Sequence, residues 1–155
     1  MARGRKHEAS RFGDAGGASA VEFALVMPVF LLLVLGALAY GIYFGAAHSV
    51  QQLAADAARV AVAGLDDCER GDLVRTYIDD NASSYVLIER HRLSVSAAQS
   101  SADPGQFLVE LAYDASSLPV WNIYPPIPMP GKTIRYVSTI RNGGEGHGPP
   151  LPCDR

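Results

Sequence analysis

Residues 23–47 read FALVMPVFLLLVLGALAYGIYFGAA, a run without a single charged side chain. As an α-helix this run would be about 37 Å long at about 1.5 Å per residue, enough to cross the hydrocarbon core of a bilayer, which is about 30 Å thick. Pro28 and Gly36 interrupt the run, but a membrane helix tolerates both residue types. The stretch therefore predicts a transmembrane helix in contact with membrane lipid.

The composition of the whole chain agrees with one membrane segment on a small protein. Its 155 residues are 48% hydrophobic and 19% charged, which is more apolar and less charged than a typical soluble domain. The net charge of −3 disfavours a nucleic-acid binder that relies on bulk positive charge.

The basic residues predict the orientation of the segment. Four of them precede it: Arg3, Arg5, Lys6 and Arg11. Only Arg59 follows closely after it. Because Lys and Arg near a membrane helix stay on the cytoplasmic side, we expect a cytoplasmic N-terminus and an exported C-terminal part. The chain is therefore predicted to cross the membrane once.

The chain divides into four parts by composition. Residues 1–17 form a basic leader, and residues 18–64 form one long helix that contains the membrane segment. Residues 65–141 form a small exported domain, and residues 142–155 a Gly/Pro-rich tail. The predicted fold class is α+β: a long transmembrane helix that continues into an exported domain with one further helix and a short antiparallel sheet.

Helical spacing supports the continuation of the first helix beyond the membrane, where Gly64 is a natural stop. The residues in this spacing are Val50, Leu53, Ala57, Val60 and Ala61. For the second helix we expect Asp72 as the N-terminal cap. Its apolar stripe would comprise Leu73, Val74, Tyr77, Ile78 and Tyr85.

Alternating apolar residues predict three strands. The first has Leu93, Val95 and Ala97 on one face, the second Phe107, Val109, Leu111 and Tyr113, and the third, Thr133–Arg141, has Ile134, Tyr136 and Ile140. Asp103-Pro104-Gly105 is a turn signal between the first two strands. The proline-rich stretch 118–131 is expected to be neither a helix nor a central strand. Within it, Trp121 either binds a partner or packs the loop onto the sheet.

Two cysteines lie in the exported part. Cys68 and Cys153 can pair in an oxidising compartment, which would stabilise the domain by about 2–4 kcal/mol. The alternative is two unpaired thiols.

The start of the apolar run carries the most informative motif. Gly17 is followed by Ala18-Ser19-Ala20-Val21-Glu22-Phe23. A carboxylate directly before 25 uncharged residues is costly in lipid. One interpretation is an acid at the membrane surface, stabilised by water and the helix dipole. The other is that the chain is cut after Gly17, which makes Glu22 the fifth residue of the mature protein.

The second interpretation resembles the class III signal of type IV pilin-like proteins. The resemblance extends to the TadE-like pseudopilins of tight-adherence (Tad/Flp) pilus systems, through Gly17, Val21-Glu22-Phe23-Ala24, Pro28 and Ala57-Ala58-Arg59. It covers residues 17–64 and is only general beyond them.

This resemblance implies the following roles. A prepilin peptidase would cleave between Gly17 and Ala18, and Glu22, next to Phe23, would pair with the α-amino group of Ala18 of another pilin or pseudopilin subunit. The protein would be a minor pseudopilin of a bacterial inner membrane that assists assembly of a Tad/Flp-type adhesion pilus.

Other residues of the apolar run have candidate packing roles. Ala37, Gly41, Gly45 and Ser49 recur every four residues, which permits close helix packing in lipid. Pro28 would kink or locally open the helix. Three aromatic residues suit the membrane interface: Tyr40, Tyr43 and Phe44.

No set of catalytic residues is evident. The sequence has no G-x-S-x-G elbow and no P-loop. Its histidines lack metal-ligand spacing: His7, His48, His91 and His147. We therefore expect no enzyme activity, no cofactor, no metal and no small-molecule substrate.

Two alternatives to the pseudopilin remain. The chain could be an unprocessed single-pass membrane protein whose exported domain binds a partner. It could also be a secreted domain, because Ala37-Leu38-Ala39 before Tyr40 is an A-x-A cleavage pattern. The second alternative leaves Glu22 unexplained.

Overall fold

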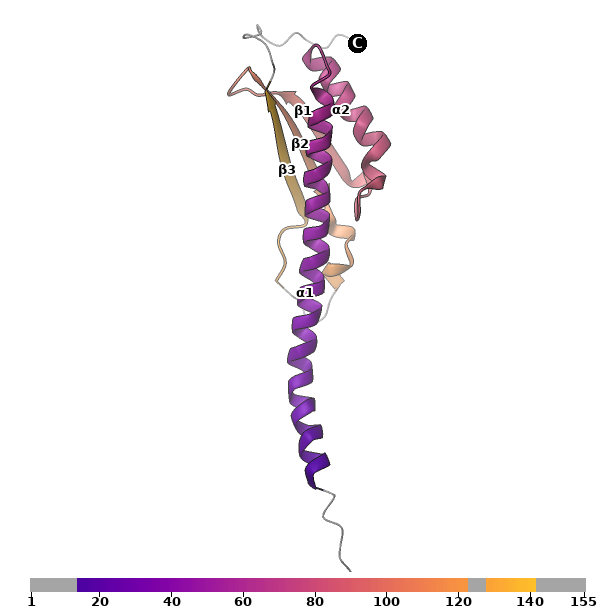
Figure 1. The fold of residues 1–155 in the computed structure, drawn as a ribbon, viewed down its shortest axis with the longest axis vertical. Coiled ribbons are helices and arrows are strands. Elements are labelled where there is room, and N and C mark those ends of the chain that lie inside the picture. The colour runs from indigo at the N-terminus through magenta and orange to yellow at the C-terminus, as the bar shows by residue number, and fades with distance from the viewer. Residues whose placement is uncertain (1–13, 123–127, 142–155) are drawn as a thin grey trace, which may run out of the picture. The chain divides into compact units, whose positions relative to one another are not determined.

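The computed structural model describes residues 14–122 and 128–141, with side chains from residue 17 onward (Figure 1). Two helices and three strands follow one another: α1 Asp14–Ala61, α2 Asp67–Asn81, β1 Leu93–Gln99, β2 Gln106–Asp114 and β3 Thr133–Arg141. This arrangement confirms the predicted α+β class.

The chain divides into two compact units, Met1–Leu38 and Ala39–Arg155. In the first unit the described residues form the N-terminal part of α1, which contains Pro28. Nearly all their side chains are exposed. The second unit holds the remainder of α1, together with α2 and the sheet.

Helix α1 is shifted toward the N-terminus relative to the prediction. It begins at Asp14 rather than residue 18 and ends at Ala61 rather than Gly64. Gly64 does not end the helix, and a glycine is required there because of a close backbone contact. A Cβ atom on Gly64 would lie 2.8 Å from the backbone nitrogen of Arg70, so only glycine lets the chain pass this close to the start of α2.

Helix α2 begins five residues before the predicted cap, so the assignment of Asp72 as N-cap was wrong. Asp66 is the cap, and its Oδ1 accepts a 2.8 Å hydrogen bond from the backbone N–H of Glu69. The Glu69 carboxylate in turn accepts one of 2.7 Å from the N–H of Leu65. This reciprocal pair resembles a capping box and satisfies two backbone donors, which explains the earlier start.

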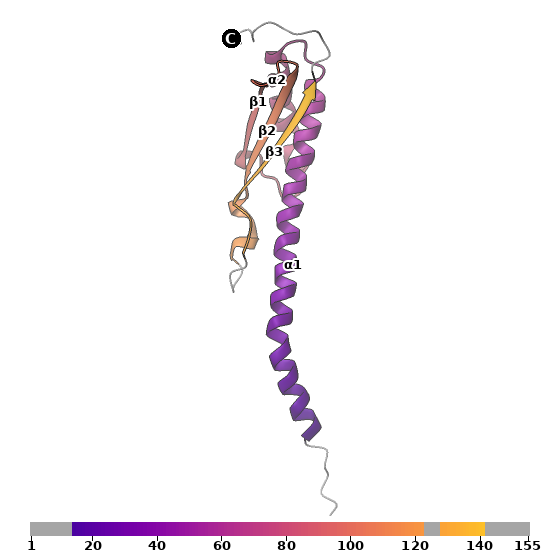
Figure 2. The ribbon, with the colours of Figure 1, turned by 90° about the vertical axis from the view of Figure 1, so that its left-hand side faces the viewer.

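The second unit has two layers, a sheet and a helical layer. The sheet has the order β1-β2-β3 with antiparallel pairing throughout. In its register Val95 faces Leu111, and Leu111 faces Tyr136. Within this unit α2 and the C-terminal part of α1 cover one face of the sheet (Figure 2).

The core lies between these layers. The inward face of β2 is fully buried: Phe107, Val109, Leu111 and Tyr113. α1 contributes Val50, Leu53, Ala57 and Ala61, and α2 contributes Val74 and Ile78. These buried residues confirm part of the expected apolar faces of the two helices. Val60, Leu73 and Tyr77 are only half-buried, and Tyr85 lies beyond the end of α2.

The connection between β2 and β3 contains short 3-10 helices, Ala115–Ser117 and Pro119–Asn122. The described part of the proline-rich stretch contains no strand, as predicted, but Pro119–Asn122 is a helical turn that the sequence analysis excluded. A proline fits the first position of such a turn because it has no N–H to satisfy there.

Candidate helix for membrane insertion and assembly

The N-terminal part of α1 presents an apolar surface. Among the described residues it is the one helix long and apolar enough to cross a membrane, with a mean hydropathy of 2.5 in its most apolar window. No residue of that window is buried within the chain. A long apolar helix of this kind indicates a single-pass membrane protein.

The predicted processing residues lie inside α1 and not before it. Gly17 and Ala18 are helical and exposed, and a Cβ on Gly17 would meet no atom within 4 Å. The peptide bond that is predicted to be cleaved, between Gly17 and Ala18, therefore lies within the N-terminal end of α1.

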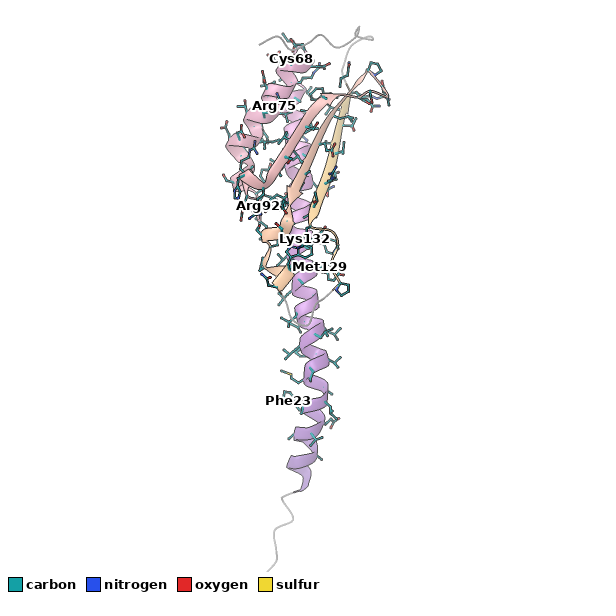
Figure 3. All side chains as sticks on the ribbon, turned by 180° about the vertical axis from the view of Figure 1, so that it is seen from behind. Phe23, Cys68, Arg75, Arg92, Met129 and Lys132 are labelled. Carbon is teal, nitrogen blue, oxygen red and sulfur yellow. The ribbon has the colours of Figure 1, made fainter. Side chains whose placement is uncertain are left out.

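Glu22 and Phe23 follow one turn after Ala18, and both are exposed. Figure 3 shows the Phe23 side chain pointing away from the helix. Residues 18 and 22 are four apart in an α-helix, so they lie on the same face. This part of the chain thus carries a carboxylate on an otherwise apolar surface.

The proposed packing residues have different surroundings. Pro28, Ala37 and Gly41 are exposed, and a Cβ on Gly41 would again meet nothing within 4 Å. A Cβ on Gly45, in contrast, would lie 3.5 Å from Cδ1 of Leu87 of the same chain. Ser49 is buried in the second unit. The small-residue stripe is therefore open at Gly41 and covered by the chain's own domain at its C-terminal end.

Two of the three interfacial aromatic residues hold the proline-rich loop. The Tyr40 hydroxyl donates a hydrogen bond to the carbonyl of Pro128, and the Tyr43 hydroxyl donates one of 3.1 Å to the carbonyl of Gly131. Phe44 remains exposed. Sequence patterns gave no sign of these hydrogen bonds, because they join segments 88 residues apart.

Trp121 packs the same loop onto the domain. Its indole Nε1 donates a 2.6 Å hydrogen bond to the carbonyl of Ala115, and its ring meets that of Tyr43 edge-on with centroids 6.4 Å apart. The ammonium group of Lys132 lies 5.6 Å from the Trp121 centroid. Figure 3 shows Lys132 close to Met129, just before β3. The packing role of Trp121 is the one that these contacts support.

A hydrogen-bond network joins α1 to α2 at a polar position. The Tyr85 hydroxyl donates to Asp56 over 2.8 Å and lies 3.1 Å from the Tyr77 hydroxyl. Burial, reinforced by these two hydrogen bonds, raises the pKa of Tyr85. Asp56 also pairs with Arg59 at 2.7 Å. No group of three or more potential metal ligands occurs within residues 14–122 and 128–141.

Cys68 lies at the start of α2 (Figure 3). Its proposed partner, Cys153, falls outside the described residues, so the Cys68–Cys153 disulfide stays a prediction.

Comparison with known proteins identifies the N-terminal segment. No curated protein and no solved structure matches the chain. Residues 17–59 match the family model of TadE-like proteins, as the motifs at the start of the apolar run suggested. This match points to a Tad pilus-related protein, from a family of structural pilus components rather than enzymes. Over residues 17–59, which make up most of α1, this chain is therefore similar to the TadE-like proteins.

Proposed function

We propose that this protein is a minor pseudopilin that a prepilin peptidase cleaves after Gly17 and that assists assembly of a Tad/Flp-type adhesion pilus. The observation that carries the proposal is the position of Glu22. It lies five residues after the first residue of the TadE-like match, on an exposed apolar helix. An unpaired carboxylate on such a helix is costly in lipid, so its presence calls for a partner.

The α-amino group of Ala18 is the partner that processing would create. In a neighbouring subunit this cation would meet the Glu22 carboxylate and remove two unpaired charges from hydrocarbon at once. Such a pair fixes the axial position of one helix against the next, even where it adds little net stability. Phe23 and the open surface at Ala37 and Gly41 would then face the helices of other pilins or pseudopilins.

The local structure is compatible with cleavage. A peptidase must unwind the first turn of α1 to reach the bond after Gly17. Glycine inside a helix costs about 1 kcal/mol relative to alanine, and Gly16 precedes Gly17. The two glycines therefore lower the cost of opening the helix at this position.

The same helix supports the membrane placement that we propose. The N-terminus would lie in the cytoplasm, where the basic leader remains, and residues 65–141 would be exported from the inner membrane. In that compartment Cys68 and Cys153 would be able to pair.

The N-terminus of the protein from its native membrane tests the proposal. Intact mass and N-terminal sequencing should give a start at Ala18. A start at Met1 or Ala2 in a host with active peptidase would instead favour the unprocessed membrane protein with a partner-binding domain. A start at Tyr40 would mean a secreted domain and would exclude the pseudopilin.

A further inference from the structure

The predicted membrane span and the folded domain overlap. A hydrocarbon core of about 30 Å takes about 20 helical residues, so a span that starts between Ala18 and Phe23 ends between about residue 38 and residue 42. The second unit nevertheless begins at Ala39, and both Ala39 and Tyr43 are buried within it. Part of the domain must therefore lie at the depth of the membrane surface.

Residues from distant parts of the chain surround α1 at this level. Tyr43 contacts the Trp121 ring, which in turn lies under the ammonium group of Lys132. On α1 itself the Tyr43 ring also meets that of Phe44, with centroids 6.0 Å apart. An aromatic cluster flanked by a lysine is the composition found where membrane proteins cross the headgroup region.

A second loop adds exposed apolar side chains at the same level. Leu87 packs against α1 at Gly45, next to Phe44. It adopts a left-handed backbone conformation with φ 65°, which is unfavourable for leucine. The Tyr113 hydroxyl holds it there through a 2.9 Å hydrogen bond to the Leu87 carbonyl. Val86 and Leu87 are 72% and 38% exposed, and Phe44 is 60% exposed.

We propose that Phe44, Val86, Leu87, Trp121 and Lys132 form an interfacial surface that rests on the lipid bilayer. Phe44, Val86 and Leu87 enter the boundary between headgroups and acyl chains. Lys132 extends its ammonium group to the lipid phosphates. The occupant is lipid rather than a protein because Phe44 follows the membrane span within a few residues on the same helix. The other residues of the surface lie at this level of α1, through Leu87 at Gly45 and Trp121 at Tyr43. The proposal rests on the membrane anchor of the proposed function, and not on processing or on a role in pili.

Trp121 is the only tryptophan of the chain, so its fluorescence reports on the surface without any substitution. The full chain is reconstituted in phosphatidylcholine–phosphatidylglycerol vesicles. Lipids with a nitroxide at a shallow acyl position serve as one quencher, and iodide equilibrated across the membrane as the other. We expect the shallow nitroxide to reduce Trp121 emission more than iodide does.

A matched pair of variants tests the depth directly. Phe44→Trp and Val62→Trp are each made in a Trp121→Phe background. Phe44 and Val62 are 60% and 62% exposed, and they are about 27 Å apart along the helix direction at about 1.5 Å per residue. The shallow nitroxide should quench the indole at position 44. At position 62 iodide should quench the indole and the nitroxide should not.

Equal quenching by the nitroxide at both positions would contradict the interfacial surface. Phe44 and Leu87 would then be candidates for contact with a protein partner. Extraction with alkaline carbonate separates this result from failure of the anchor. If the chain stays in the membrane but the lipid nitroxide does not quench the indole at position 44, only the interfacial surface is contradicted. If carbonate releases the chain, the membrane span is contradicted as well.

Discussion

The Tyr43 hydroxyl donates a hydrogen bond of 3.1 Å to the carbonyl oxygen of Gly131, 88 residues further along the chain. Together with the hydrogen bond from Tyr40 to Pro128, it attaches the segment that leads into β3 to the middle of α1. The helix that carries the membrane segment is thus also an element of the domain core. A change in this hydrogen bond should therefore alter the stability of the domain.

Tyr43→Phe should destabilise the second unit by about 0.5–1.5 kcal/mol, the usual net contribution of one hydrogen bond. Urea unfolding of the full chain in detergent, followed by Trp121 emission, measures this loss because Trp121 contacts Tyr43. Tyr136→Phe is the matched control, since the Tyr136 hydroxyl accepts an exposed hydrogen bond from Gln51. Equal losses in the two variants would mean that the Gly131 contact adds nothing specific.

Gly64→Ala and Gly41→Ala should change stability in opposite directions. The added Cβ at position 64 would lie 2.8 Å from the Arg70 nitrogen and 3.0 Å from its Cα, so the backbone must move at a cost of about 1–3 kcal/mol. At position 41 the added methyl group meets no atom. There alanine should stabilise the helix by about 1 kcal/mol. The same unfolding assay measures both, and a neutral Gly64→Ala would show that the close approach is not required.

Tyr85→Phe should reduce the loss of stability in alkali. Burial and the hydrogen bonds with Tyr77 and Asp56 raise the pKa of Tyr85 above its ordinary value of 10.0. The folded state therefore holds the Tyr85 proton more tightly than the unfolded state. This contribution is fully present below pH 10 and is lost as the pH rises further.

Unfolding free energies of wild type and Tyr85→Phe, measured on both sides of pH 10, should thus converge in alkali. Tyr136→Phe again serves as the control, because it removes a tyrosine hydroxyl whose exposed hydrogen bond with Gln51 is not part of the Tyr77–Tyr85–Asp56 network. Parallel pH curves for wild type and Tyr85→Phe would contradict a role for the network in proton retention.

The sequence predicted those elements whose local pattern is unambiguous. β3 has the predicted bounds, Thr133–Arg141, because its apolar residues alternate without interruption. The buried face of β2 followed from the same alternation. The cap of α2 was misplaced because several acidic residues lie close together. The spacing of Asp66 and Glu69, which fits a capping box, was the signal that could have identified it.

Long-range contacts could not be predicted in this way. Tyr40 and Tyr43 are residue types that are common at a membrane interface. No local sequence pattern indicates that their hydroxyl groups bind a loop 88 residues away. The positive φ of Leu87 is likewise imposed by tertiary structure, through Tyr113 and the packing against α1. The candidate assembly residues form a linear motif, so they can be proposed from the sequence alone, and their roles stay predictions.

Gly17→Leu should prevent processing. A bulky side chain at this position would not fit a peptidase site that accepts glycine, and it would also strengthen the first turn of α1. Immunoblotting of membranes should show the longer, uncleaved chain. Gly41→Leu, which lies far from the cleavage position, should be processed as in wild type. Cleavage of Gly17→Leu at the normal position would contradict the glycine requirement.

Glu22→Gln should be processed normally and yet fail to support piliation. The amide keeps the size of the side chain but lacks the charge that would pair with the new α-amino group of Ala18. Mass spectrometry should therefore find the Ala18 start, while electron microscopy of a complemented deletion strain should find few or no pili. Glu22→Asp keeps the charge on a shorter side chain, so it should restore part of the pilus number. Normal pilus number with Glu22→Gln would exclude charge pairing as the function of Glu22, and the carboxylate would then be only an acid at the membrane surface.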